Sequence, residues 1–192
     1  MSKIEWTEQT WNPMVGCSKI SAGCQNCYAI QQAYRNDAMG QKLDNPGRLA
    51  YYDGLTEKRG NRVEWTGVVR FVPEALEIPL KRKKPTVWFV NSMSDLFHES
   101  VTDEQLFKIL KIIRDTPQHT YQVLTKRPAR MLDIMKHLSW RTGKAGEGGG
   151  FFAYRGIPGA NPLRNLWLGV TYSKRRAGMI IDPVILCVSN EQ

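Results

Sequence analysis

Thr86-Val-Trp-Phe-Val90 is a nearly continuous apolar run, and the polar segment Asn91-Ser-Met-Ser-Asp95 follows it directly. Such a run is typical of a strand inside a parallel sheet, where both faces are covered. Thr102-Asp-Glu-Gln105 then has the pattern of a capping box, and apolar residues at helical spacing continue to about position 114. Thr120-Tyr-Gln-Val-Leu124 indicates the next strand. The stretch therefore predicts a strand, a polar loop, a helix and a second strand.

The same alternation extends to both sides of this stretch. Downstream, the apolar spacing predicts a helix over 127–138 and a strand over 166–170. Upstream, we expect a strand within 10–16, a helix over 26–39, a polar loop over 41–66, a strand over 67–71 and a short helix over 74–80. Strands that alternate with helices predict an α/β fold with parallel strands and covering helices.

The length of 192 residues suits one domain over 1–192, with a glycine-rich insertion at about 141–165. The amino terminus carries no apolar signal segment, and no apolar run approaches a membrane span of ~20 residues. We therefore expect a cytoplasmic protein that binds no membrane and keeps its thiols reduced.

The formal net charge is +9, and two basic runs, Lys81–Lys84 and Lys174–Arg176, contribute to it. A basic balance favours a polyanionic partner, so a nucleic acid or a nucleotide is one interpretation. A basic surface that serves only solubility is the other.

Three of the four cysteines, Cys17, Cys24 and Cys27, lie within eleven residues, and Cys187 is distant. A zinc site would need a fourth ligand, and the candidates Cys187, His98 and His119 have no useful spacing. A [4Fe–4S] cluster held by three thiolates leaves one iron open and needs no further ligand. The pattern favours an iron–sulfur cluster; zinc and no metal remain alternatives.

Polar side chains follow each predicted parallel strand, at the end where sites of such folds collect. One group is Asn91, Ser92, Ser94 and Asp95, with His98 close behind. These side chains are candidates to bind a cofactor, although Asp95 has the alternative of capping the following turn. Thr125, Lys126 and Arg127 form a second group, and Thr171-Tyr172 a third. Two cations before a helix indicate either a site for an anionic substrate group or an exposed basic pair without that role.

Several motifs resemble an uncharacterised three-cysteine-motif family of phages and prophages, which itself resembles radical S-adenosylmethionine enzymes. The similar segments are Glu5-Trp-Thr7, Trp11-Asn-Pro13, Gly16-Cys-Ser-Lys-Ile-Ser21, Gly23-Cys24, Asn26-Cys-Tyr-Ala29, Phe89 to His98, Leu124-Thr-Lys-Arg-Pro128 and Leu166-Trp-Leu-Gly-Val170. The usual superfamily spacing is Cys-x3-Cys-x2-Cys, whereas the first gap here has six residues. Asn26 stands where those enzymes usually have an aromatic residue.

The resemblance implies a partial (β/α) barrel, which we expect to be truncated at the C-terminus. It also implies a [4Fe–4S] cluster on Cys17, Cys24 and Cys27, with S-adenosylmethionine bound through Asn91, Ser92, Ser94 and Asp95. Such enzymes take an electron from a donor protein and cleave the sulfonium to give a 5′-deoxyadenosyl radical. A radical enzyme that acts on a nucleic acid or nucleotide is thus the leading hypothesis. The alternatives are a zinc-stabilised nucleic-acid-binding module without enzymatic activity and an inactive remnant of the family.

Overall fold

The computed structural model describes residues 5–140, 163, 165–171 and 184–185. Its main sheet has the strand order β1-β6-β7-β8-β9. The bounds are β1 Gln9–Trp11, β6 Val87–Val90, β7 Thr120–Thr125, β8 Leu166–Val170 and β9 Val184–Ile185. The first four strands pair in parallel, and β9 pairs antiparallel with β8. The predicted α/β class with parallel strands is therefore confirmed, and the expected all-parallel sheet is wrong at β9.

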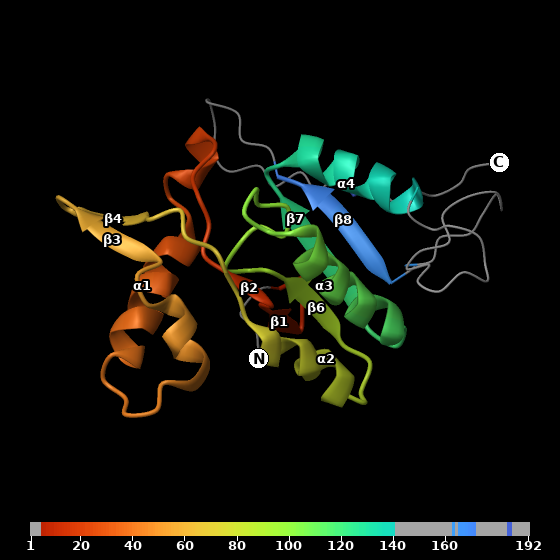
Figure 1. Cartoon of the computed structure of the whole chain (residues 1–192), viewed down its shortest axis with the longest axis horizontal. Coiled ribbons are helices and arrows are strands. Elements are labelled where there is room, and N and C mark those ends of the chain that lie inside the picture. Colours follow the sequence, from red (N-terminus) through yellow and green to blue (C-terminus); the bar gives the residue numbers. More distant parts are fainter. Residues whose placement is uncertain (1–4, 141–162, 164, 172–183, 186–192) are drawn as a thin grey trace.

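Helices connect the parallel strands, and Figure 1 shows α3 lying against the sheet with α4 beside β8. Their bounds are α1 Tyr28–Gly40, α2 Glu77–Lys81, α3 Asp103–Asp115 and α4 Pro128–Trp140. The capping box predicted for α3 is present, because Thr102 Oγ1 accepts from the Gln105 N–H while the Gln105 side chain accepts from the Thr102 N–H. Local sequence signals thus place α3 within one or two residues of its observed bounds.

The segment 41–66, expected to be a polar loop, contains ordered structure that the sequence did not indicate. A 3₁₀ helix covers Gly47–Tyr52, and β3 (Thr56–Arg59) and β4 (Arg62–Trp65) form an antiparallel hairpin that packs on α1. Gly60 has φ +60° in the two-residue turn, a conformation that glycine adopts readily. The hairpin carries charged residues in place of alternating apolar ones, and this explains why the strand pattern was invisible.

Shorter elements complete the connection between β1 and β6. Strand β2 (Met14–Val15) pairs antiparallel with β5 (Arg70–Phe71), and a 3₁₀ turn over Pro73–Leu76 leads into α2. A further 3₁₀ turn, Ala22–Cys24, lies inside the cysteine segment. The strand predicted over 67–71 is therefore reduced to β5, and the helix predicted over 74–80 is divided between the 3₁₀ turn and α2.

The core lies between the parallel sheet and its helices, and Trp11 is fully buried there. Its indole N–H donates to the Ala75 carbonyl at 2.7 Å, and its ring packs at 5.4 Å from that of Tyr121. This one side chain thereby ties β1 to β7 and to the 3₁₀ turn before α2.

No helix within the described ranges is long and apolar enough to cross a membrane. The predicted insertion at 141–165 lies almost wholly outside the described residues. The basic run Lys174–Arg176, Tyr172 and Cys187 lie outside them as well.

Candidate functional site

The carboxyl ends of β1, β6, β7 and β8 bring the predicted site segments together at one edge of the sheet. The cysteine segment begins just beyond β1, and Gly16 bridges to Ser94 beyond β6. The side chain of Lys126, beyond β7, donates to Thr171 Oγ1 beyond β8 at 3.0 Å. Parallel strands place their carboxyl ends at a common edge, so the four polar segments meet there as the sequence predicted.

The cysteine segment leaves the sheet through a sharp turn at Gly16, whose φ is +89°. The Gly16 N–H donates to the Met93 carbonyl at 3.1 Å, which fixes the start of the segment against the loop after β6. Cys24 ends the 3₁₀ turn, and Cys27 is the N-cap residue of α1. All three cysteines are free thiols and are partly exposed. None of the three is thus committed to a disulfide among the described residues.

Arg127 is the centre of a buried polar cluster that reaches the first cysteine. Its Nη1 donates to Asp95 Oδ2 at 3.1 Å and lies 3.9 Å from the Cys17 sulfur. Its Nη2 donates to Ser18 Oγ at 2.9 Å, and its Nε contacts both carboxylate oxygens of Glu99 at 2.9 Å. The guanidinium therefore has protein partners on all sides. It contacts the cysteine segment, where the sequence had suggested an anionic substrate group.

Asp95 links the loops after β6 and β7. Its Oδ1 accepts from the Phe97 N–H at 3.0 Å and from the Thr125 hydroxyl at 2.7 Å. Its Oδ2 accepts from the Lys126 N–H at 3.1 Å as well as from Arg127. Each carboxylate oxygen thus has two partners within the protein, and Asp95 does cap the turn after β6, the alternative the sequence allowed.

The other predicted cofactor residues also have partners at the edge of the sheet. Asn91 Oδ1 accepts from the Met14 N–H at 3.3 Å, the Ser92 hydroxyl donates to Asn12 Oδ1 at 3.0 Å and the Ser94 hydroxyl donates to the Met14 carbonyl at 3.1 Å. Asn91 has φ +57°, and its buried Nδ2 has no hydrogen-bond partner within the described residues. A buried amide without a partner is a group that a ligand could satisfy.

Sequence reasoning missed two members of the cluster, Ser18 and Glu99. Both neighbour a predicted residue, but neither type carries a signal in a single sequence. His98, which was noted, is buried, and its Nε2 lies 2.8 Å from Ser18 Oγ. Its Nδ1 accepts from the Ser100 N–H, so the ring proton must reside on Nε2 and be donated to Ser18. His98 therefore holds the cysteine segment in place from the β6 side.

The pKa values of Cys17 and Cys24 are shifted in opposite directions. Burial raises the pKa of Cys17 to about 11, although the positive charge of Arg127 works in the opposite direction. Burial also opposes ionisation of Cys24, but hydrogen bonds from Ile20 and Ser21, with the charge of Lys126, leave its pKa lowered. Cys24 is therefore the more readily ionised of the two, and Cys17 needs a further positive charge to become a thiolate.

The spacing of the three cysteine sulfurs can be compared with the needs of a single zinc ion and of a four-iron cluster. Among the described residues, no three His, Cys, Asp or Glu side chains lie in a group that could hold a metal ion. A single zinc ion draws its thiolates together at Zn–S distances of ~2.3 Å. A cluster of four irons is wider and spreads its ligands further apart. The arrangement of the three thiols therefore gives no support to either metal centre, and the choice between them rests on the number of thiolate donors in the sequence.

One protein family, described as "Protein of unknown function (DUF5131)", matches residues 1–186. The chain belongs to this family. The match includes the cysteine segment and every parallel strand, so the buried cluster around Arg127 lies within the family's shared region. No curated protein and no solved structure matches the chain significantly.

Proposed function

We propose that this DUF5131 protein is an iron–sulfur, radical-S-adenosylmethionine-like enzyme that acts on a nucleic acid or nucleotide. The observation that carries the proposal is the position of the three free cysteines. One segment carries all three, and it begins at the carboxyl edge of the parallel sheet, beside the polar ends of three further strands. Bound there, the cluster and S-adenosylmethionine would supply one-electron chemistry that no side chain can provide.

The strand order supports a partial (β/α) barrel as the architecture. The parallel strands follow one another in chain order, β1-β6-β7-β8, without reversal. A doubly wound sheet reverses its order at a switch point, whereas a barrel adds each strand beside the previous one. The pairing of β9 ends the parallel run, so the proposed barrel is a partial one.

The protein groups have distinct roles in this proposal. Cys17, Cys24 and Cys27 hold the cluster, and the guanidinium of Arg127 offsets negative charge at the Cys17 sulfur. The unpartnered Nδ2 of Asn91 is the donor offered to a ligand at the edge of the sheet. Among the described residues, the side chain of Lys126 donates to the neutral hydroxyl of Thr171, so its cation is offered to an anionic group.

Anaerobic purification followed by iron and acid-labile sulfide analysis tests the proposal. We expect about four irons and four sulfides per chain, because three thiolates fit one site-differentiated cubane. Alanine in place of Cys17, Cys24 or Cys27 should abolish the cluster, and Cys187→Ala is the matched control that should retain it. Stoichiometric zinc without sulfide would refute the proposal.

The nucleic-acid part of the proposal depends on the basic surface. Lys81–Lys84 lie at the end of α2 and before β6, at the edge opposite the cysteine segment. Six phosphate contacts, from these four residues with Lys126 and Arg127, would give a slope of roughly −5 in log K against log salt on duplex DNA. Because Arg127 is occupied by protein partners, five contacts remain, and the expected slope is about −4.5. Fluorescence anisotropy at several salt concentrations measures the slope, and an absence of binding at low salt would remove nucleic acid as the substrate.

A further inference from the structure

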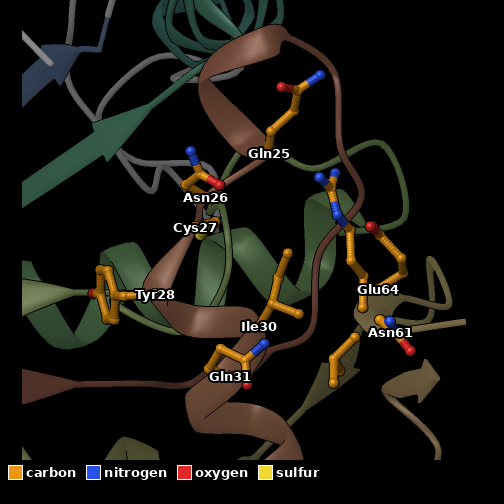
Figure 2. A pocket seen from close by; sticks show the side chains of 10 residues that line it. Gln25, Asn26, Cys27, Tyr28, Ile30, Gln31, Asn61 and Glu64 are labelled. Carbon is orange, nitrogen blue, oxygen red and sulfur yellow. The ribbon is translucent and has the colours of Figure 1, made fainter. Parts of the chain in front are cut away.

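A polar pocket opens between the start of α1 and the β3–β4 hairpin, with a volume of about 360 Å³. Figure 2 shows Asn61 and Glu64 of the hairpin across from Ile30 and Gln31 of α1. Cys27 forms part of the wall, so the pocket adjoins the proposed cluster. Its volume falls at the lower end of the range of small-molecule sites, ~300–1,000 Å³.

Four carboxamides dominate the wall: Gln25, Asn26, Gln31 and Asn61. In the described part of the chain, none of their side chains has a hydrogen-bond partner in the protein, and each offers both a donor and an acceptor. The other wall residues include the apolar side chains of Ile30 and Val63 and the thiol of Cys27. A ligand for this wall is neutral where it meets the carboxamides and carries its own donors and acceptors.

One further wall residue narrows the class of ligand. Arg62 is exposed and forms no ion pair with any described residue, whereas Glu64 is paired with Lys19. Tyr28 also borders the pocket, but its hydroxyl donates to the Ser92 carbonyl at 2.8 Å and Figure 2 shows its ring directed away from the hairpin. The wall that faces the hairpin thus joins amide groups and one cation that has no ion pair among the described residues.

We propose that this pocket binds one nucleotide of the substrate. The carboxamides would recognise the edge of the base through their donors and acceptors, and Arg62 would contact the phosphate of the nucleotide. The inference rests on the proposed function, since it names the substrate class of the same site. The adenine of S-adenosylmethionine has the same chemistry, and it carries no phosphate for Arg62.

Isothermal titration of the anaerobically purified protein with each of the four ribonucleoside 5′-monophosphates tests the proposal. Ribose 5-phosphate is the probe without a base, and S-adenosylmethionine is the alternative source of a base. We expect at least one nucleotide to bind more tightly than ribose 5-phosphate. Arg62→Ala should weaken that binding about tenfold, as should Gln31→Ala combined with Asn61→Ala.

The chain offers matched controls close to the pocket. Arg59 faces Arg62 in the hairpin register but is outside the pocket wall, and Gln32 follows Gln31 on the exposed side of α1. Arg59→Ala and Gln32→Ala should leave nucleotide affinity within twofold of the unmodified protein. Thermal unfolding of each variant checks that it is folded.

Three results would overturn the inference: no nucleotide binding, equal affinity for ribose 5-phosphate, or pocket variants that weaken S-adenosylmethionine alone. Iron and sulfide analysis of the same preparations separates this inference from the proposed function. Nucleotide binding that depends on Arg62 in a protein without iron would support the pocket and refute the cluster. A full iron–sulfur cluster without nucleotide binding would support the cluster and refute the pocket.

Discussion

Replacement of Arg127 by methionine tests whether one buried ion pair holds the candidate site together. The side chains of Arg127 and Asp95 are 4% and 9% exposed. Removal of one partner leaves a buried charge without compensation, which typically costs about 3–5 kcal/mol. Asp95 would keep its bonds from the Phe97 N–H, the Thr125 hydroxyl and the Lys126 N–H, and these reduce the cost. We therefore expect Arg127→Met to lower the free energy of unfolding by about 3 kcal/mol.

The same guanidinium provides an internal control through Glu99, whose side chain is 62% exposed. An exposed ion pair contributes only about 0–1 kcal/mol, so Glu99→Gln should lower the free energy of unfolding by less than about 1 kcal/mol. Combining Arg127→Met with Asp95→Asn removes both buried charges. The double variant should therefore lose about 2 kcal/mol less than the sum of the single losses.

Urea unfolding of the metal-free, reduced protein, followed by tryptophan fluorescence, measures these free energies. Working without metal separates the ion pair from any contribution of a bound cluster. The reasoning fails if Arg127→Met costs less than about 1 kcal/mol, or if Glu99→Gln costs as much as Arg127→Met. Additive losses in the double variant would show that Arg127 and Asp95 act independently.

Three further predictions follow from local geometry and charge. Gly16→Ala should destabilise the protein by about 3 kcal/mol in urea unfolding, because a Cβ there would overlap a backbone carbonyl oxygen at a φ of +89°. Gly60→Ala, with φ +60° and open space, should cost only about 1 kcal/mol. In metal-free protein at pH 8, iodoacetamide should modify Cys24 before Cys17. The reason is that burial raises the pKa of Cys17 to about 11, whereas the pKa of Cys24 is lowered. Mass spectrometry of early time points measures the order of modification, and the opposite order would contradict the prediction. Burial, together with the nearby guanidinium of Arg127, lowers the pKa of His98 in the folded protein. In the unfolded chain, His98 keeps its ordinary pKa of ~6.5 and therefore binds a proton at a higher pH. The stability of the fold should therefore fall as the pH drops through that value. His98→Asn should flatten this dependence between pH 7.5 and 5.5, and an unchanged slope would assign it to other groups.

The parallel strands and their helices were predictable because each carries its own local signal. The run at Thr86–Val90 is apolar on both faces, and the capping box at Thr102 marks the start of α3. The β3–β4 hairpin was not predictable, because it exposes charged side chains and is stabilised by packing on α1. Strand β9 is too short for a pattern, and its antiparallel pairing with β8 depends on tertiary structure.

The site was predictable to the level of segments but not of contacts. The rule that polar groups collect at the carboxyl ends of parallel strands placed Asp95 and Lys126 near the cysteines. It could not show that Asp95 and Arg127 would bind each other, since partner choice depends on side-chain geometry at the edge of the sheet. The pocket beside Cys27 was hidden for the same reason, because one of its walls belongs to the unpredicted hairpin.

The cysteine segment differs from the rest of the site in how it is held. Residues 18–27 include no buried side chain, so hydrophobic packing contributes little to their conformation. Their described anchors are polar: the bonds of Ser18 with Arg127 and His98, and the ion pair of Lys19 with Glu64. Ligand bonds to a cluster would add the missing stabilisation, since metal binding by such a segment contributes directly to its folding free energy. The contacts of Arg127 therefore hold the start of the segment at Cys17, and the start of α1 holds its other end at Cys27.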